Sequence, residues 1–121
     1  MAMPSDYQKR FEEFGLASPE AIQIALSRDE THVLDVRTKD EIAAAGRLQH
    51  PNWTQTACTP SECPELSAAP EKFVPNKDAT VVIYCRSGRR AGKAKEVLEG
   101  HGYSNVLNAG GYDDVVGLLP L

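Results

Sequence analysis

One stretch constrains the fold of this chain more than any other feature. It is an apolar run that is closed by a cysteine and followed by a loop with a glycine and three arginines. Residues 81–84 read Val-Val-Ile-Tyr, Cys85 follows, and residues 86–90 read Arg-Ser-Gly-Arg-Arg. A wholly apolar run of this length is typical of a central parallel strand that is covered on both faces. A helix-like pattern begins at Ala91, so the chain is predicted to turn sharply from strand to helix just after the cysteine.

This predicted turn is suited to sulfur chemistry. A helix N-terminus presents unpaired backbone N–H groups and the positive end of its dipole, and both attract anions. Such a setting stabilises a thiolate, which is the reactive form of cysteine. We therefore predict that Cys85 is a catalytic nucleophile with a charged and exposed sulfur, and that Gly88 takes a positive φ where the loop curls. The predicted substrate-binding residues are Arg86, Ser87, Gly88, Arg89 and Arg90.

The composition indicates one domain. A chain of 121 residues is close to the commonest domain size, and we divide it into an N-terminal segment of residues 1–17 and a domain of residues 18–121. The net charge of −4 argues against nucleic acid or an anionic membrane as a partner. No apolar run approaches the about 20 residues of a membrane helix, and the first residues do not have the pattern of a secretory signal.

The three cysteines indicate a reducing compartment. An odd number of cysteines in a chain without a secretion signal is typical of free thiols, so we expect a cytoplasmic protein or one from another reducing compartment. The sequence leaves open a removed organelle transit peptide. Cys58 and Cys63 lie in a proline-rich loop and are expected to be incidental, with a disulfide or a resolving thiol as the alternatives. We expect no metal, because the histidines show no ligand spacing relative to the cysteines, and no cofactor.

The order of the predicted elements is typical of an α/β fold with mostly parallel strands. One helix is expected to follow the N-cap Ser18, and another to follow a capping box made by Thr38 and Glu41. The segment between residues 47 and 76 is the least regular and contains a short predicted helix at residues 70–73. A helix is expected after the cysteine loop, ending near Gly100, and a short one at residues 112–116. The predicted strands cover residues 32–36, 53–56, 80–84 and 105–107.

Several unusual residues follow predicted strands and should meet at one edge of the sheet. Ligands bind at the carboxyl ends of the strands in open parallel sheets. Arg37 is spaced to pair with Glu41 one helical turn later, and Asp35 can accept amide hydrogen bonds at a loop corner. These features favour a supporting role over chemistry. The residues predicted to support the site are Asp35, Arg37, Glu41, Gly110 and Gly111.

Four motifs, in this order, resemble those of the single-domain rhodanese (thiosulfate sulfurtransferase) family. They are residues 34–37 with Glu41, residues 46–48 with Asn52, the loop at residues 85–91, and residues 108–111. The resemblance implies a three-layer α/β sandwich, in which a central parallel sheet of about five strands has helices on both faces. The sequence departs from the family pattern at Arg47, where the family often has His, and at residues 50–51, where His-Pro replaces a frequent Gly-Ala pair.

The resemblance also implies a reaction. A sulfane sulfur would pass from thiosulfate or a related donor to cyanide or a thiol through a persulfide on Cys85. We expect Arg86 and Arg90 to donate to a sulfonate or sulfite oxygen, and Arg89 to be solvated. The expected partners are a small anionic sulfur donor and a cyanide or thiol acceptor, which includes a protein thiol. Neither nucleic acid nor a membrane is expected, and the chain is expected to be a monomer.

Two other functions are considered. The first is a binding module that relays sulfur to a protein thiol or senses oxidants. The second is a cysteine phosphatase or arsenate reductase, whose sites resemble Cys-x5-Arg. Here Arg90 is the fifth residue after Cys85 and Ala91 is the sixth, so the loop is one residue short for a tetrahedral oxyanion. The sequence therefore favours a sulfurtransferase over a phosphatase.

Overall fold

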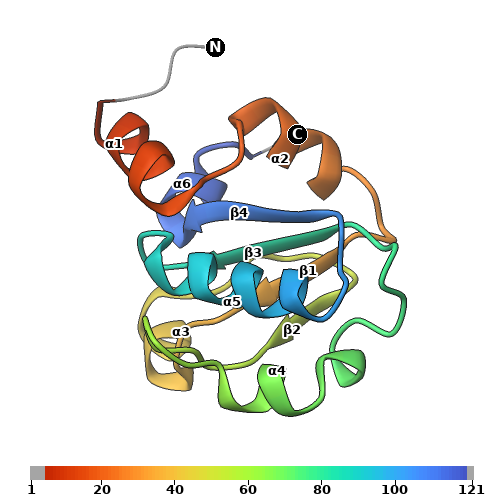
Figure 1. The fold of residues 1–121 in the computed structure, drawn as a ribbon. Coiled ribbons are helices and arrows are strands. Elements are labelled where there is room, and N and C mark those ends of the chain that lie inside the picture. Colours follow the sequence, from red (N-terminus) through yellow and green to blue (C-terminus); the bar gives the residue numbers. More distant parts are fainter. Residues whose placement is uncertain (1–4, 120–121) are drawn as a thin grey trace.

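Four parallel strands form the centre of the computed structural model, which describes residues 5–119 (Figure 1). The α/β fold predicted from the sequence is confirmed, but residues 5–119 contain four strands where about five were expected. The chain beside the free edge of β4 donates the Ala17 N–H to the Asn108 carbonyl at 2.8 Å. It then enters a helix at Pro19, so no fifth strand forms there. The strands are β1 (His32–Asp35), β2 (Trp53–Gln55), β3 (Val81–Cys85) and β4 (Val106–Gly111), in the order β2-β1-β3-β4.

Two helices, which begin at Pro19 and Lys39, start at the capping signals in the sequence. The Ser18 hydroxyl accepts the Ala21 N–H at 3.2 Å, and Thr38 and Glu41 form the predicted capping box. Helices α1 and α4 were not predicted. Residues 1–4 and 120–121, which belong to the predicted segment and domain, lie outside the described residues. The helices are α1 (Ser5–Phe14), α2 (Pro19–Leu26), α3 (Lys39–Ala45), α4 (Pro64–Ala68), the 3₁₀ helix η1 (Pro70–Lys72), α5 (Arg89–Gly100) and α6 (Tyr112–Val116).

Strand β3 divides the interior into two cores, because successive side chains of a strand point to opposite faces. Ile83 and Cys85 lie in the core that α4 and α5 cover. Val82 and Tyr84 lie in the core that α2 and α6 cover. All five residues of the strand are buried, as predicted for a central strand with helices on both faces. The Cys85 side chain therefore lies on the face of the sheet that α5 covers.

A disulfide joins Cys58, which follows β2, to Cys63, which precedes α4. The expectation that both are free thiols is therefore wrong. The turn between them brings the ends together, since the Thr59 N–H donates to the Glu62 carbonyl at 2.7 Å. Cys85 is free and buried. Because two of the three cysteines are paired, the cysteine count no longer supports a reducing compartment. Within residues 5–119, no helix has the length and apolar character that crossing a membrane requires.

Candidate active site

The sulfur of Cys85 lies at the junction between β3 and α5. It accepts the Gly88 N–H at 3.1 Å and the Ala91 N–H at 3.4 Å. Ala91 belongs to the first turn of α5, so the positive end of that helix dipole faces the sulfur. Backbone N–H donors and a helix N-terminus both attract negative charge, so this position suits an anionic group. The strand, turn and helix that the sequence predicted around this cysteine are all present.

The sulfur is not exposed, which corrects one expectation. Cys85 has no accessible surface and packs in the same core as Val36 and the Cys58–Cys63 disulfide. The loop folds back over Cys85, and the Gly88 and Ala91 N–H groups both point to its sulfur. A reagent can touch this sulfur only if the loop moves.

Gly88 has the positive φ predicted for it, at 107°. A Cβ at this position would lie 2.6 Å from Leu16 Cδ2 and 3.1 Å from the Gly110 backbone, so the loop has no room for a side chain. The Gly88 carbonyl accepts the Asn108 side-chain amide at 2.8 Å. The same carbonyl accepts the Gly92 N–H at 2.9 Å. One side-chain and one backbone hydrogen bond therefore fix the orientation of the Gly88 carbonyl.

The three loop arginines point to different surroundings. Arg86 is exposed and lines a cleft of about 300 Å³ beside α3 and α6, together with Tyr112 and Asp113. Arg89 is exposed and lines a different surface hollow that includes Glu13. Arg90 is half-buried and turns toward α3. Of the three, only Arg86 borders the cleft beside the loop.

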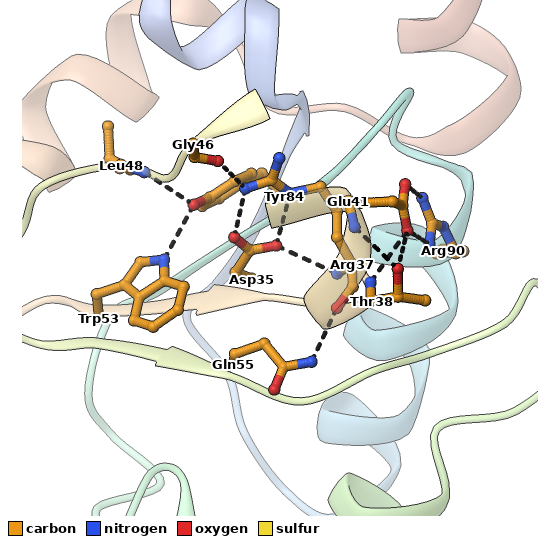
Figure 2. A network of polar contacts seen from close by, with 10 residues as sticks. All are labelled: Asp35, Arg37, Thr38, Glu41, Gly46, Leu48, Trp53, Gln55, Tyr84 and Arg90. Atoms are coloured by element: carbon orange, nitrogen blue, oxygen red, sulfur yellow. Dashed lines mark hydrogen bonds and ion pairs between the residues drawn. The ribbon is translucent and has the colours of Figure 1, made fainter. Parts of the chain in front are cut away.

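Arg90 and Glu41 form a bidentate ion pair between α5 and α3 (Figure 2). The two nitrogen–oxygen distances are 2.7 and 2.8 Å. The hydrogen bonds from Arg90, supported by the Thr38 N–H, lower the pKa of Glu41 from its ordinary 4.5 to about 2. The expected Arg37–Glu41 pair is wrong, because Glu41 turns to the loop arginine instead. Glu41 thus ties the cap of α3 to the cysteine loop.

Arg37 pairs with Asp35 below the same cleft. The Arg37 side chain donates to both carboxylate oxygens, at 2.9 and 2.7 Å, and its N–H donates to one of them at 3.1 Å. Both residues are buried, and the guanidinium lies 4.5 Å from the centre of the Tyr112 ring. A buried pair of this kind fixes geometry more than it adds stability. These contacts agree with a supporting role for Asp35 and Arg37.

Tyr84 lies next to the Asp35–Arg37 pair and makes its own hydrogen bonds (Figure 2). Its hydroxyl accepts the Trp53 indole N–H at 2.9 Å and the Leu48 N–H at 3.1 Å. Burial raises the pKa of Tyr84 to about 12. The tyrosine just before the cysteine is therefore held as a neutral core residue.

The end of β4 packs directly against the loop. A Cβ at Gly111 would overlap the Arg86 carbonyl. Gly110 has a φ of 82°, which favours glycine, and a Cβ there would lie 2.8 Å from Asp114 Oδ2. Both predicted glycines therefore lie beside the loop, and each allows a close approach that a side chain would block.

Three residues near the loop were not predicted as part of the site. Asn108 links the Gly88 carbonyl to the Phe14 carbonyl. Arg10 and Asp114 form an ion pair next to Ser87. Asn108 belongs to a motif that the resemblance already contained, but nothing local to Arg10 marks it as a loop contact.

Among residues 5–119, no group of three or more His, Cys, Asp and Glu side chains is placed to hold a metal ion.

The parallel sheet and the cysteine loop at its edge agree with comparisons to known proteins. A family model described as "Rhodanese-like domain" matches residues 18–117, and the chain belongs to this family. Thiosulfate sulfurtransferase PspE from Escherichia coli (strain K12) is 52% identical over 42 residues, which are 35% of this chain and 40% of that protein. The match thus spans less than half of this curated relative.

Solved structures show the same fold. A rhodanese with anions from E. coli is 32% identical, with a TM-score of 0.56 over 69% of this chain and 89% of that one. The human single-domain sulfurtransferase TSTD1 is 23% identical, with a TM-score of 0.63 over 84% and 95%. The polysulfide-sulfur transferase homodimer from Wolinella succinogenes is 19% identical, with a TM-score of 0.66 over 93% and 85%. The last two likenesses concern the fold alone.

Proposed function

We propose that this protein is a sulfurtransferase that carries a sulfane sulfur on Cys85. The thiolate attacks the outer sulfur of thiosulfate, and a new bond forms between the two sulfur atoms. The sulfur–sulfur bond of thiosulfate breaks, and its electron pair leaves with sulfite. An acceptor, either cyanide or a thiolate, then attacks the outer sulfur of the Cys85 persulfide and regenerates the thiolate. This is covalent catalysis in two half-reactions.

The observation that carries the proposal is the pair of N–H donors on the Cys85 sulfur. They stabilise negative charge on the attacking thiolate without a separate base. The membership of the rhodanese-like family and the name of the PspE relative supply the sulfur chemistry and the thiosulfate donor. The name of this relative does not specify an acceptor, so the proposal includes cyanide, a small thiol and a protein thiol. In this proposal the protein acts as a monomer.

Arg86 is the donor-binding residue of this proposal. It is exposed, it follows the nucleophile directly, and it lines the cleft beside the loop. An arginine at this place attracts an anionic donor despite the net negative charge of the chain. Arg90 is paired with Glu41, which lines the same cleft as Arg86, and the Arg90 guanidinium also interacts with Cys85. Because Cys85 is covered, loop movement is part of donor binding.

The test is to find the transferred sulfur on one peptide. After incubation with thiosulfate, mass spectrometry should show one added sulfur atom, about 32 Da, on the peptide that contains Cys85. C85S should lose both the mass gain and sulfite release, whereas C58S should keep them. Phenyl phosphate, offered in parallel, should not be hydrolysed. Sulfite release that survives in C85S would overturn the assignment.

A further inference from the structure

A helix that lies outside the matched family residues contacts the cysteine loop. Helix α1 lies beside α6 and the end of β4 (Figure 1), whereas the family model begins at residue 18. Arg10, on this helix, donates from Nη1 to the Ser87 carbonyl at 2.8 Å. Ser87 lies in the loop between the nucleophile and α5. One cation of α1 therefore touches the backbone of the predicted active site.

The contacted carbonyl and a thiolate donor belong to the same peptide unit. The Ser87 C=O and the Gly88 N–H are the two ends of one planar group, and in a trans peptide they point in opposite directions. Arg10 holds the oxygen end, and the hydrogen end donates to the Cys85 sulfur at 3.1 Å. A charged donor at the oxygen polarises the peptide and strengthens the hydrogen bond that its N–H makes.

We propose that Arg10 is a positioning residue for sulfur transfer, which orients and polarises the Ser87–Gly88 peptide so that its N–H stabilises the Cys85 thiolate. The inference rests on the proposed sulfurtransferase function. It adds a residue of α1 to a site that the sequence motifs confine to the strand ends and the loop.

Asp114 holds the guanidinium in place for this task. Arg10 donates to the two Asp114 oxygens at 2.7 and 2.9 Å, and the side chains of Arg10 and Asp114 are 15% and 21% exposed. The hydrogen bonds that Arg10 donates to Asp114 raise the pKa of Arg10, so the side chain stays charged. The same carboxylate accepts the Gly111 N–H at 2.7 Å. Arg10 is thus held between the end of β4 and the loop.

Packing and hydrogen bonds, besides the Arg10–Asp114 ion pair, hold the end of α1 against the loop. Leu16, just after the helix, would collide with any side chain at Gly88, and Asn108 joins the Phe14 carbonyl to the loop. Removing the Arg10 charge should therefore leave α1 in place while the peptide loses its cation. This separates positioning from folding in the experiment.

The experiment compares R10Q, R10K and K9Q in the full chain. Lys9 is exposed on the same helix, so K9Q removes an equal charge away from the loop. Removing a donor that touches a reacting anion directly costs about 10²–10³ in rate, and Arg10 acts through one peptide, so we expect a smaller loss. In R10Q, the single-turnover rate of sulfite release at saturating thiosulfate should fall about tenfold, with the KM changed by less than about twofold.

Alkylation of Cys85 by iodoacetamide gives a second measurement that needs no sulfur donor. Cys85 is the free cysteine, and mass spectrometry locates the added group. If Arg10 stabilises the thiolate, R10Q should be alkylated more slowly, R10K should recover much of the rate, and K9Q should match the wild type. If Arg10 only packs α1, R10Q should loosen the loop and expose the buried sulfur, so alkylation should be equal or faster, which would overturn the proposal. A wild-type protein that is alkylated but releases no sulfite contradicts the proposed function instead.

Discussion

Single residues decide whether the cysteine loop can form, and Gly88 is one of them. Its φ of 107° and the 2.6 Å that would separate a Cβ at this position from Leu16 Cδ2 both oppose any other residue. We expect G88A to lower the free energy of unfolding by about 1–3 kcal/mol, because the strained backbone and the collision add. Sulfite release should fall at least about tenfold, since the Gly88 N–H is a donor to the sulfur. Urea denaturation and a thiosulfate assay measure the two effects.

Gly100 is the matched control for this prediction. It ends α5, and a Cβ at this position would meet nothing within 4 Å. G100A should keep the wild-type rate and raise the free energy of unfolding by about 0.5–1 kcal/mol, because alanine restricts the unfolded chain. Equal effects of G88A and G100A would show that the loop tolerates a side chain.

The residues that the sequence predicted belong to local patterns in the chain, whereas those that it missed make contacts with distant residues. Cys85 and the loop are consecutive in the chain, so local pattern was enough to find them. The Arg10–Asp114 pair joins residues 104 positions apart, and no local signal marks such a contact. Arg37 and Glu41 have the right spacing for a pair, but tertiary packing gives Glu41 to Arg90. Local charge spacing therefore identified the right residues and the wrong partners.

At the scale of elements, the Arg90–Glu41 pair joins α5 to α3 and should make stability depend on pH. The pKa of Glu41 is lowered to about 2 from its ordinary 4.5 by the hydrogen bonds from Arg90. The folded state therefore gains stability above about pH 4.5 and loses it as the pH falls toward about 2. E41Q should lower the free energy of unfolding near neutral pH by roughly 1 kcal/mol and flatten this acid decline.

Glutamine isolates the ion pair because it can still complete the capping box with Thr38. Denaturation curves of wild type and E41Q, measured at several pH values between about 2 and 7, make the comparison. If both proteins lose stability in parallel below pH 4.5, Arg90 does not stabilise the Glu41 carboxylate in solution.

The sequence predicted best those elements whose ends carry their own signals. Helix α2 begins at Ser18 and Pro19 and α3 begins at Thr38, as expected from capping. Helix α4 also begins with a proline, but it lies in the irregular segment and its N-cap residue, Cys63, makes no side-chain cap. Helix α1 carries a weaker signal, the helical spacing of Tyr7, Phe11 and Phe14. The fifth strand came from the resemblance and not from any apolar run.

At the scale of the whole molecule, the Cys58–Cys63 disulfide joins the segment after β2 to the start of α4, and both cysteines lie in the core that holds Cys85. It closes a short loop, with a sequence separation of 5, so it restricts the unfolded chain less than a disulfide across a long loop would. We expect C58A/C63A to lower the free energy of unfolding by about 2 kcal/mol, mostly through the entropy of the unfolded state. Persulfide formation on Cys85 should persist, because neither cysteine contributes a hydrogen bond to its sulfur.

Reduction gives an independent form of the same experiment. A phosphine reductant should lower the stability of the wild type by the amount that the double substitution does, and should leave C58A/C63A unchanged. Disulfides persist in oxidising compartments, so a stable bond would favour such a compartment over the cytoplasm predicted from the odd cysteine count. Equal stability of the reduced and untreated wild type would contradict a stabilising disulfide between Cys58 and Cys63. The stability of the whole domain thus reports on a pairing that the cysteine count alone misjudged.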